Sequence, residues 1–259
     1  MSTTSRASRS CGRTCSRMSE PLLRAVVVRE DVRAPVWPWT VPVLRTLERL
    51  ELHPGVTFLV GENGTGKSTL VEGIAVAAGF PAEGGSLGFG AHTREEVAAL
   101  ADGLRLERGY RRPRTGFFLR AESFFNVATE IDRLEDEEAG LLLSYGGVSL
   151  HERSHGEGFL ALALHRFGPD GLYVLDEPEA ALSPQSSLAL LRRMHDLVDA
   201  GSQFVIATHS PILMGYPDAW IYELSDRGAE RIEYEATDHV RLTRSFLDDR
   251  ERFLRQLFA

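Results

Sequence analysis

Lysine is almost absent from this chain of 259 residues, and its one lysine, Lys67, lies in the segment GENGTGKST. Arginine provides the other 28 of the 29 long cationic side chains. A phosphate-binding loop needs a compact ammonium that reaches the β- and γ-phosphates through a narrow gap, and a planar guanidinium has the wrong shape for this. The isolated lysine is therefore the first indication of a phosphate-binding loop.

Long apolar runs are also lacking. No run approaches the roughly 20 apolar residues that span a bilayer, so we expect no membrane insertion. The only cysteines, Cys11 and Cys15, lie near the N-terminus, and a cysteine-free remainder indicates a reducing compartment, which predicts a cytoplasmic protein. The net charge of −8 argues against a protein that coats nucleic acid by bulk attraction. Arginines crowd the stretch from 105 to 120, which leaves open a local basic patch or a solvated face.

Residues 1–19 consist mostly of serine, threonine and arginine and offer almost nothing to bury. Such a composition predicts a disordered tail, because it cannot offset the entropy lost on ordering. An organelle transit peptide, or a true start at Met18, are alternatives that the sequence leaves open. Residues 20–259 are expected to form one large domain.

Short apolar segments at 56–60, 172–176 and 203–208 alternate with helical segments at 67–78, 158–167 and 184–200. This alternation predicts an α/β fold with a mostly parallel central sheet flanked by helices. The stretch from about 87 to 157 holds few strand patterns apart from 116–120, and it predicts an inserted helical lobe. There is no internal repeat, and no heptad pattern long enough for a coiled coil.

The segment GENGTGKST contains the full Gly-x-x-x-x-Gly-Lys-Ser pattern, between an apolar strand and a helix. This context is typical of a nucleoside-triphosphate phosphate-binding loop. We expect the helix N-terminus and backbone N–H groups to face the phosphates, Lys67 to bridge the β- and γ-phosphates, and the Ser68 hydroxyl to bind Mg²⁺. The predicted ATP-binding residues are Gly61, Glu62, Asn63, Gly64, Thr65, Gly66, Lys67, Ser68 and Thr69.

In a second motif, LYVLDEPEAALSP, an apolar strand ends in Asp176 and Glu177. Two carboxylates at the end of a buried strand are costly without a cation nearby. Asp176 is predicted to hold the Mg²⁺ shell, and Glu177 to orient and polarise the attacking water. Because ligands bind beyond the carboxyl ends of parallel strands, we expect Asp176 to converge with the phosphate-binding loop. The alternative is a helix start with acidic residues in its first turn.

A third motif, HERSHGEGFLALAL, places a Ser-x-x-Glu pattern, Ser154 to Glu157, before an apolar helix. This pattern predicts a capping box. Gly156 and Gly158 near the helix start also leave backbone N–H groups accessible to an anion. If this helix lies on another lobe, its N-terminus is out of reach of the chain's own nucleotide but within reach of the nucleotide of a second copy.

A fourth motif, IATHSP, places His209 directly after a buried strand. Taken alone, an imidazole at this point is typical of an ordinary loop histidine. Its position one strand after the Asp-Glu pair favours a γ-phosphate sensor.

Together these motifs resemble the ATP-binding-cassette ATPases, in the branch of SMC and RecF proteins, and more closely the small bacterial AAA-family ATPases with an SHGE signature and a DEPEAALSP box. The resemblance covers about residues 22–225. It implies that GENGTGKST is the Walker A loop and that Lys67, Glu177 and His209 are catalytic residues. It also implies a head-to-tail homodimer with two ATP molecules, each held between the Walker A loop of one copy and the signature of the other. The implied signature is Ser154, His155, Gly156 and Glu157.

The sequence departs from the family pattern at three points. His155 replaces the first glycine of the transporter form LSGGQ. Glu122 would stand where the glutamine of the Q-loop is expected, and it is the third predicted metal ligand besides Ser68 and Asp176. No clear aromatic residue is available to stack on adenine; Trp37 and Trp39 are weak candidates.

The leading function is Mg²⁺-dependent ATP hydrolysis in which ATP-driven dimerisation acts as a switch, with DNA or a protein effector as the partner, in DNA repair or phage defence. The alternative is the nucleotide-binding subunit of a membrane transporter, against which the SHGE signature argues. A GTPase would carry an Asn-Lys-x-Asp motif to recognise guanine. This chain lacks it, because its single lysine lies in GENGTGKST. A small kinase does not need the signature, and Glu177 argues against a non-hydrolysing scaffold.

Overall fold

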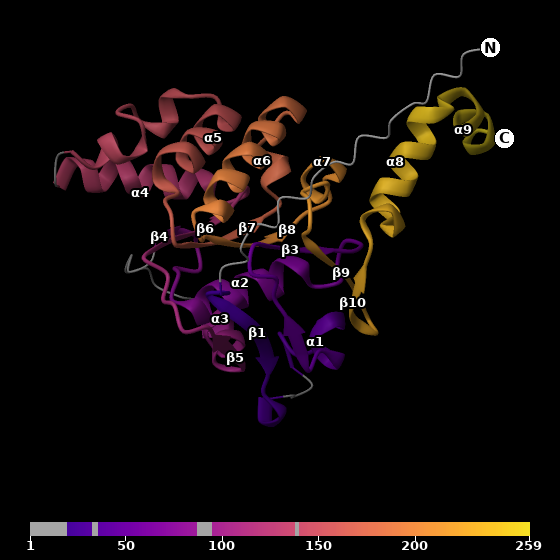
Figure 1. The fold of residues 1–259 in the computed structure, drawn as a ribbon, viewed down its shortest axis with the longest axis horizontal. Coiled ribbons are helices and arrows are strands. Elements are labelled where there is room, and N and C mark those ends of the chain that lie inside the picture. The colour runs from indigo at the N-terminus through magenta and orange to yellow at the C-terminus, as the bar shows by residue number, and fades with distance from the viewer. Residues whose placement is uncertain (1–19, 33–35, 87–94, 138–139) are drawn as a thin grey trace, which may run out of the picture.

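The structure is a computed structural model that describes residues 20–32, 36–86, 95–137 and 140–259. The predicted disordered tail, 1–19, lies outside the described residues. A seven-stranded sheet forms the centre of the molecule (Figure 1). Its strands in spatial order are β10 (Gly228–Ile232), β9 (Trp220–Ser225), β3 (Val56–Val60), β8 (Gln203–Ala207), β7 (Gly171–Asp176), β6 (Thr115–Arg120) and β4 (Gly85–Ser86).

The five inner strands, from β9 to β6, run parallel, whereas β10 and β4 pair antiparallel at the two edges. All residues of β3, β7 and β8 are buried, which explains their continuous apolar sequences, since helices cover both faces of a parallel sheet. The prediction of a mostly parallel sheet flanked by helices is confirmed.

The two faces of the sheet carry different sets of helices (Figure 1). One face is covered by α4 (Phe124–Glu137), α5 (His155–Arg166), α6 (Pro184–Asp199) and α7 (Pro211–Met214). The other is covered by α1 (Pro42–Thr46), α2 (Lys67–Ala78) and α3 (Glu95–Asp102). A separate cluster of buried apolar side chains fills each side. Burial of these faces is the main favourable term in folding.

A second, antiparallel sheet of three strands packs on the α2 side, in the order β2 (Arg49–Glu51), β1 (Leu23–Val28) and β5 (Leu104–Arg108). The buried side chain of Gln203, at the start of β8, joins the two sheets. Its amide exchanges two hydrogen bonds of 2.8 Å with the backbone of Leu23 and donates a third, also of 2.8 Å, to the carbonyl of His53.

Within the range 87–157, predicted as a helical lobe with a strand at 116–120, that strand is present as β6, and a further strand, β5, belongs to the small sheet. β6 pairs along its whole length with β7, from Thr115 opposite Gly171 to Arg120 opposite Asp176. β5 escaped prediction because its charged side chains alternate at a partly exposed edge. The described helical part begins with α4 and continues through short 3₁₀ turns at Leu141–Tyr145 and Leu150–Glu152 into α5.

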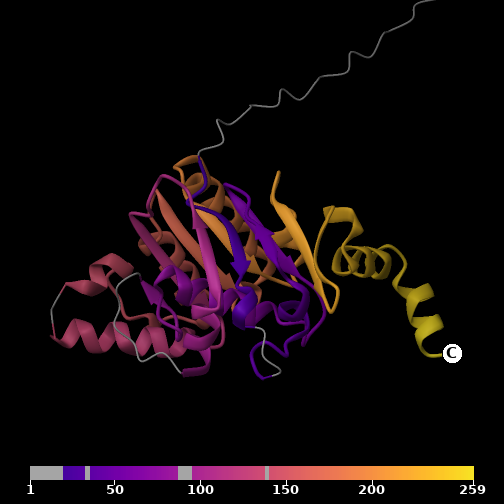
Figure 2. The same ribbon diagram turned by 90° about the horizontal axis from the view of Figure 1, so that it is seen from below.

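The C-terminal part leaves the sheet after the hairpin of β9 and β10. A 3₁₀ turn at Tyr234–Ala236 leads into α8 (Asp238–Asp248) and α9 (Arg250–Leu257), which extend away from the body (Figures 1 and 2). Val240 anchors α8 in the core, whereas α9 buries no residue. Among the described residues, every helix is too short or too polar to cross a membrane.

Candidate functional site

The loop between β3 and α2 is shaped by three glycines with positive φ: Gly61 at 139°, Gly64 at 83° and Gly66 at 103°. A Cβ on Gly66 would lie 2.2 Å from a methyl group of Val41, so no other residue fits there without a shift. A Cβ on Gly64 would meet no atom within 4 Å. The loop is therefore tightly packed on one side and open on the other.

No side chain caps α2, whose N-cap residue is Gly66. The first N–H groups of a helix lack intrahelical partners, and together with the helix dipole they attract an anion. An uncapped helix end behind an open glycine loop therefore fits a phosphate group.

Lys67 is 4% exposed, and its Nζ donates hydrogen bonds of 2.9 Å to the carbonyls of Gly61 and Glu62. Burial lowers the pKa of Lys67, while the nearby carboxylates of Glu177, Asp176 and Glu179 act in the opposite direction. The lysine and the acidic strand end thus lie within electrostatic reach of each other. The two carbonyls use two of the three N–H donors of the ammonium, which leaves one for an anionic partner.

Asp176 ends β7 and is buried. Burial raises its pKa to about 6, against the opposing effects of the Arg120 guanidinium and the Ser68 hydroxyl. Its Oδ2 lies 3.4 Å from Nε of Arg120, whereas Oδ1 is buried without a hydrogen-bond partner among the described residues. A buried carboxylate oxygen that lacks a partner, beside a hydroxyl group, fits a cation that takes oxygen ligands.

Within the described residues, no group of three or more His, Cys, Asp or Glu side chains could form a metal site by itself.

Glu177 has a left-handed backbone, with φ 48° and ψ 51°, which is uncommon for a residue other than glycine. Its N–H donates a hydrogen bond of 2.9 Å to the carbonyl of Ala207, and Pro178 follows it. Its side chain is 39% exposed and lies 3.6 Å from Nε2 of His209. This conformation turns the carboxylate out of the strand, beside the histidine.

His209 follows β8 and is held from two sides. Its backbone N–H donates to the buried carboxylate of Glu179, and its Nδ1 lies 2.7 Å from Nε2 of His239 on α8. Burial lowers the pKa of His209, and the neighbouring Lys67 and His239 lower it further. A neutral imidazole at pH 7 follows. Burial also raises the pKa of Glu179, one of whose oxygens has no partner among the described residues.

The Ser-x-x-Glu segment forms the predicted capping box: the Ser154 hydroxyl accepts a hydrogen bond from the Glu157 N–H, and the Glu157 carboxylate accepts one from the Ser154 N–H. His155 packs edge-on against Phe124, with ring centroids 5.0 Å apart. A Cβ on Gly156 would lie 2.8 Å from the carbonyl oxygen of Ala181. The α5 N-terminus is thus packed against the segment after Glu177, and α5 lies on the opposite face of the sheet from α2 (Figure 1).

The residue that contacts Asp176 from β6 is Arg120, and not Glu122. Arg120 also pairs with Glu72 on α2, at 3.1 Å, whereas Glu122 is exposed two residues further on. Arg120 was missed because the sequence shows it only as one of many arginines. Its position opposite Asp176 is a matter of strand register.

The two tryptophans differ in exposure. Trp39 is buried, and a Cβ on Gly103 would lie 2.2 Å from its ring. Trp37 is 47% exposed. Only Trp37 is therefore accessible enough to stack on a base.

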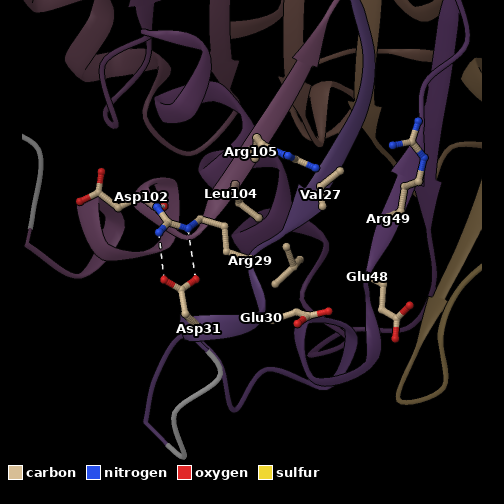
Figure 3. A pocket seen from close by; sticks show the side chains of 10 residues that line it. Val27, Arg29, Glu30, Asp31, Glu48, Arg49, Asp102, Leu104 and Arg105 are labelled. Atoms are coloured by element: carbon tan, nitrogen blue, oxygen red, sulfur yellow. Dashed lines mark hydrogen bonds and ion pairs between the residues drawn. The ribbon is translucent and has the colours of Figure 1, made fainter.

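A cavity of about 1020 Å³ opens beside the small sheet (Figure 3). It is lined by side chains of both charges; Arg29 pairs with Asp31 in it. None of the predicted nucleotide-binding residues lines this cavity. The candidate site instead lies where the glycine loop after β3, the end of β7 and the loop after β8 come together at one edge of the sheet.

Comparison with protein families gives two matches. Residues 91–215 match the family described as "AAA domain, putative AbiEii toxin, Type IV TA system", and residues 44–104 match a family described as "AAA domain". Among solved structures, the SMC head domain from Thermotoga maritima shares 14% identity, covers 82% of this chain and 99% of that chain, and has a TM-score of 0.44. A nucleotide-free ATP-binding cassette from an ABC transporter has the same TM-score, with 17% identity and coverage of 78% and 87%.

Two curated relatives are similar in sequence. The "ABC transporter G family member 47" of Oryza sativa subsp. japonica is 24% identical over 82% of this chain, which spans only 17% of that protein. A "Putative ABC transporter ATP-binding protein" of Caldanaerobacter subterraneus subsp. tengcongensis is 30% identical, over 59% of this chain and 68% of its own length. On this identity and coverage, the chain belongs to the ATP-binding-cassette family of P-loop ATPases.

Proposed function

We propose that this ATPase binds the phosphates of ATP in the loop Gly61 to Thr69, with Lys67 at the β- and γ-phosphates. The observation that carries the proposal is that β3 and β7 flank β8 as parallel strands, so the loop of the buried Lys67 and the carboxylates of Asp176 and Glu177 follow the same edge of the sheet. The open side of Gly64 and the uncapped start of α2 support the same placement. Trp37 is the candidate for contact with the base.

Ser68 and Asp176 would hold Mg²⁺, which neutralises charge on the phosphate oxygens when bound. The partnerless Oδ1 of Asp176 supports this assignment. Glu122, exposed near the end of β6, would act only through water. In the nucleotide-free chain, Arg120 provides the positive charge beside Asp176.

Glu177 would orient and polarise the water that attacks the γ-phosphate, and His209 would hydrogen-bond that phosphate. The left-handed backbone of Glu177 supports a functional role, because strained conformations persist where the surrounding structure and the function demand them. His209 Nε2 is buried without a hydrogen-bond partner among the described residues and lies beside Glu177.

The signature, Ser154 to Glu157, would complete the nucleotide site of a second copy. Its helix lies on the opposite face of the sheet from α2, and Ser154, His155 and Glu157 are exposed. A head-to-tail pairing of two copies, related by two-fold symmetry, would bring each signature to the partner's Walker A loop. The domain formed by residues 20–259 includes the helical part from α4 to α5. ATP-driven pairing of two copies of this domain would act as the switch.

Mixing of two inactive variants tests this arrangement. Ser154→Arg blocks the signature, and Glu177→Gln removes the water-orienting carboxylate. A mixed dimer would contain one site with both residues intact, so activity should return to about one quarter of the wild-type rate for random pairing. Ser154→Thr, which keeps the helix cap, should stay active. If the mixture stays as inactive as the separate variants, the composite site is wrong.

The partner that responds to ATP-driven dimerisation would be a protein effector or DNA. The family match to a domain described with a type IV toxin–antitoxin system favours a protein effector. Stimulation of ATP hydrolysis by duplex DNA would instead favour a repair function. An ATPase assay on the purified protein with and without duplex DNA separates the two.

A second candidate is the ATP-binding subunit of a membrane transporter, which the 30% identical relative favours by its name. His155 in place of the first glycine of LSGGQ argues for the other branch. Co-purification of a membrane protein with the tagged chain would support the transporter function.

A further inference from the structure

The two histidines His209 and His239 form a direct pair. Nδ1 of His209 lies 2.7 Å from Nε2 of His239, and the ring centroids are 4.8 Å apart at an interplanar angle of 59°. The other ring nitrogens, Nε2 of His209 and Nδ1 of His239, are buried without hydrogen-bond partners among the described residues. A short contact between two imidazoles requires one nitrogen to donate and the other to accept.

In one arrangement His209 donates from Nδ1 and keeps a bare lone pair on Nε2. That lone pair would face the Glu177 carboxylate, 3.6 Å away, and any phosphate bound beside it. The arrangement would also leave an N–H on Nδ1 of His239 buried without an acceptor. A buried donor without an acceptor costs the full desolvation free energy of the group.

In the other arrangement His239 donates from Nε2 to Nδ1 of His209. His209 then carries its proton on Nε2, where it faces the Glu177 carboxylate as a donor. On the His239 side, the group left without a partner is then a lone pair on Nδ1, and the N–H of His209 has a carboxylate oxygen 3.6 Å away. Which ring nitrogen of a histidine carries the proton is set by the hydrogen bond that the other nitrogen makes. The second arrangement is favoured because it turns an N–H of His209 toward a carboxylate and avoids a buried N–H on Nδ1 of His239.

His239 is well fixed for this task. It is the second residue of α8, whose N-cap residue Thr237 accepts a hydrogen bond on its hydroxyl from the N–H of Val240. Thr237 is fully buried, and Tyr234, three residues before it, donates a hydrogen bond of 3.0 Å to the carbonyl of Pro211, two residues after His209. The start of α8 and the loop of His209 are thus tied together at several points.

We propose that His239 is a positioning residue that holds His209 as the Nε2–H tautomer, so that His209 presents a hydrogen-bond donor to the γ-phosphate of ATP. This inference deepens the proposed function, since it rests on the role of His209 there. It also assigns a function to α8, which lies outside the four nucleotide-binding motifs: the first turn of this helix is part of the hydrolytic site.

The test compares His239→Phe, which keeps a ring and removes the donor, with His239→Gln, whose side-chain amide can donate to Nδ1. Long-range ¹H–¹⁵N spectra of histidine-labelled, nucleotide-free protein report the tautomer of His209, assigned with a His209→Gln variant. Wild type and His239→Gln should show the Nε2–H tautomer, whereas His239→Phe should lose it. In kinetics, His239→Phe should lower kcat by about tenfold or more, as loss of an orienting partner typically does, with a smaller change in KM for ATP.

Arg241→Gln, on the same helix with a side chain that is 69% exposed, is the matched control and should behave as wild type. Thermal unfolding of each variant checks that α8 is still folded. A wild-type His209 in the Nδ1–H form, or an unchanged tautomer and kcat in His239→Phe, would overturn the inference. These outcomes are separate from failure of the proposed function, because the tautomer is measured without nucleotide and wild-type ATPase activity is measured independently.

Discussion

Glu177 combines two features at the scale of a single residue: a left-handed backbone and a half-exposed carboxylate beside His209. Its neighbour Asp176 continues the strand and is buried. The change of backbone direction at Glu177 therefore separates a buried carboxylate, which suits a metal ion, from an exposed one, which suits contact with a water molecule. We propose different tasks for these two adjacent carboxylates because their surroundings differ.

Replacement of Glu177 by glutamine should remove the base and keep the shape. We expect kcat for ATP hydrolysis to fall by about 100-fold or more, because a positioned acid–base group typically contributes that much. Binding of a labelled ATP analogue should be retained. Glu152→Gln, an exposed glutamate on the 3₁₀ turn before the signature, is the control. A Glu177→Gln enzyme with wild-type turnover would show that another group activates the water.

Lys67 offers a second test at the residue scale. Lys67→Ala should reduce affinity for ATP by about 100-fold or more, since it removes a charge-assisted contact in a buried place. Lys67→Arg should fail as well, because the guanidinium is too broad for the gap that the ammonium of Lys67 fills between the carbonyls of Gly61 and Glu62. Calorimetric titration with a non-hydrolysable analogue measures both. Unchanged affinity in the alanine variant would refute the phosphate-loop assignment.

At the scale of elements, the start of α5 and the segment after Glu177 are in close contact through Gly156 and Ala181. A signature helix and a hydrolytic loop that touch in this way would move together. Gly156→Ala should push the two apart, since its Cβ would lie 2.8 Å from a backbone oxygen that cannot rotate away.

We therefore expect Gly156→Ala to lower the ATPase rate by about tenfold while ATP binding by the isolated chain stays unchanged. Leu164→Ala, at an exposed position further along α5, is the control. Steady-state kinetics and binding of an ATP analogue, measured on the same preparations, show whether the ATPase rate falls while ATP binding is retained. Loss of binding together with turnover would indicate that the substitution disturbs the whole domain.

The elements also show what the sequence can and cannot predict. The phosphate-binding loop, the Asp176–Glu177 strand end and the capping box at Ser154 are contiguous patterns whose local geometry is dictated by their own residues. By contrast, the pairing of Arg120 with Asp176 depends on strand register, and the pairing of His209 with His239 depends on where α8 returns. The separate antiparallel sheet of β2, β1 and β5 could not be predicted either, because β1 pairs with β5 across a long stretch of sequence.

At the scale of the whole molecule, the burial of Asp176 reduces the stability of the fold at neutral pH. Burial raises the pKa of Asp176 from 3.8 to about 6, so folding favours its protonated form. The stability that this group contributes is fully present below pH 3.8 and is lost as the pH rises through about 6. At neutral pH the free protein therefore keeps a buried carboxylate whose charge a bound cation would offset.

Asp176→Asn cannot ionise and should stabilise the nucleotide-free protein at about pH 8 by roughly 2–3 kcal/mol, or a shift in Tm of roughly 5 °C. The gain should fall to roughly half at about pH 5, where the folded wild type is mostly protonated. Thermal unfolding at the two pH values measures this. The same variant should lose stabilisation by Mg²⁺ and ATP. A variant less stable than wild type at both pH values would show that the pairing of Asp176 with Arg120 outweighs the burial of its charge.

The most direct test of the account is the mass of Glu177→Gln in solution, measured by light scattering after size exclusion with Mg²⁺ and ATP. We predict a dimer with ATP, a monomer with ADP, and a monomer with ATP when Ser154→Arg is added to the same chain. A Glu177→Gln protein that binds ATP and still elutes as a monomer would contradict the claim that two copies enclose the nucleotide.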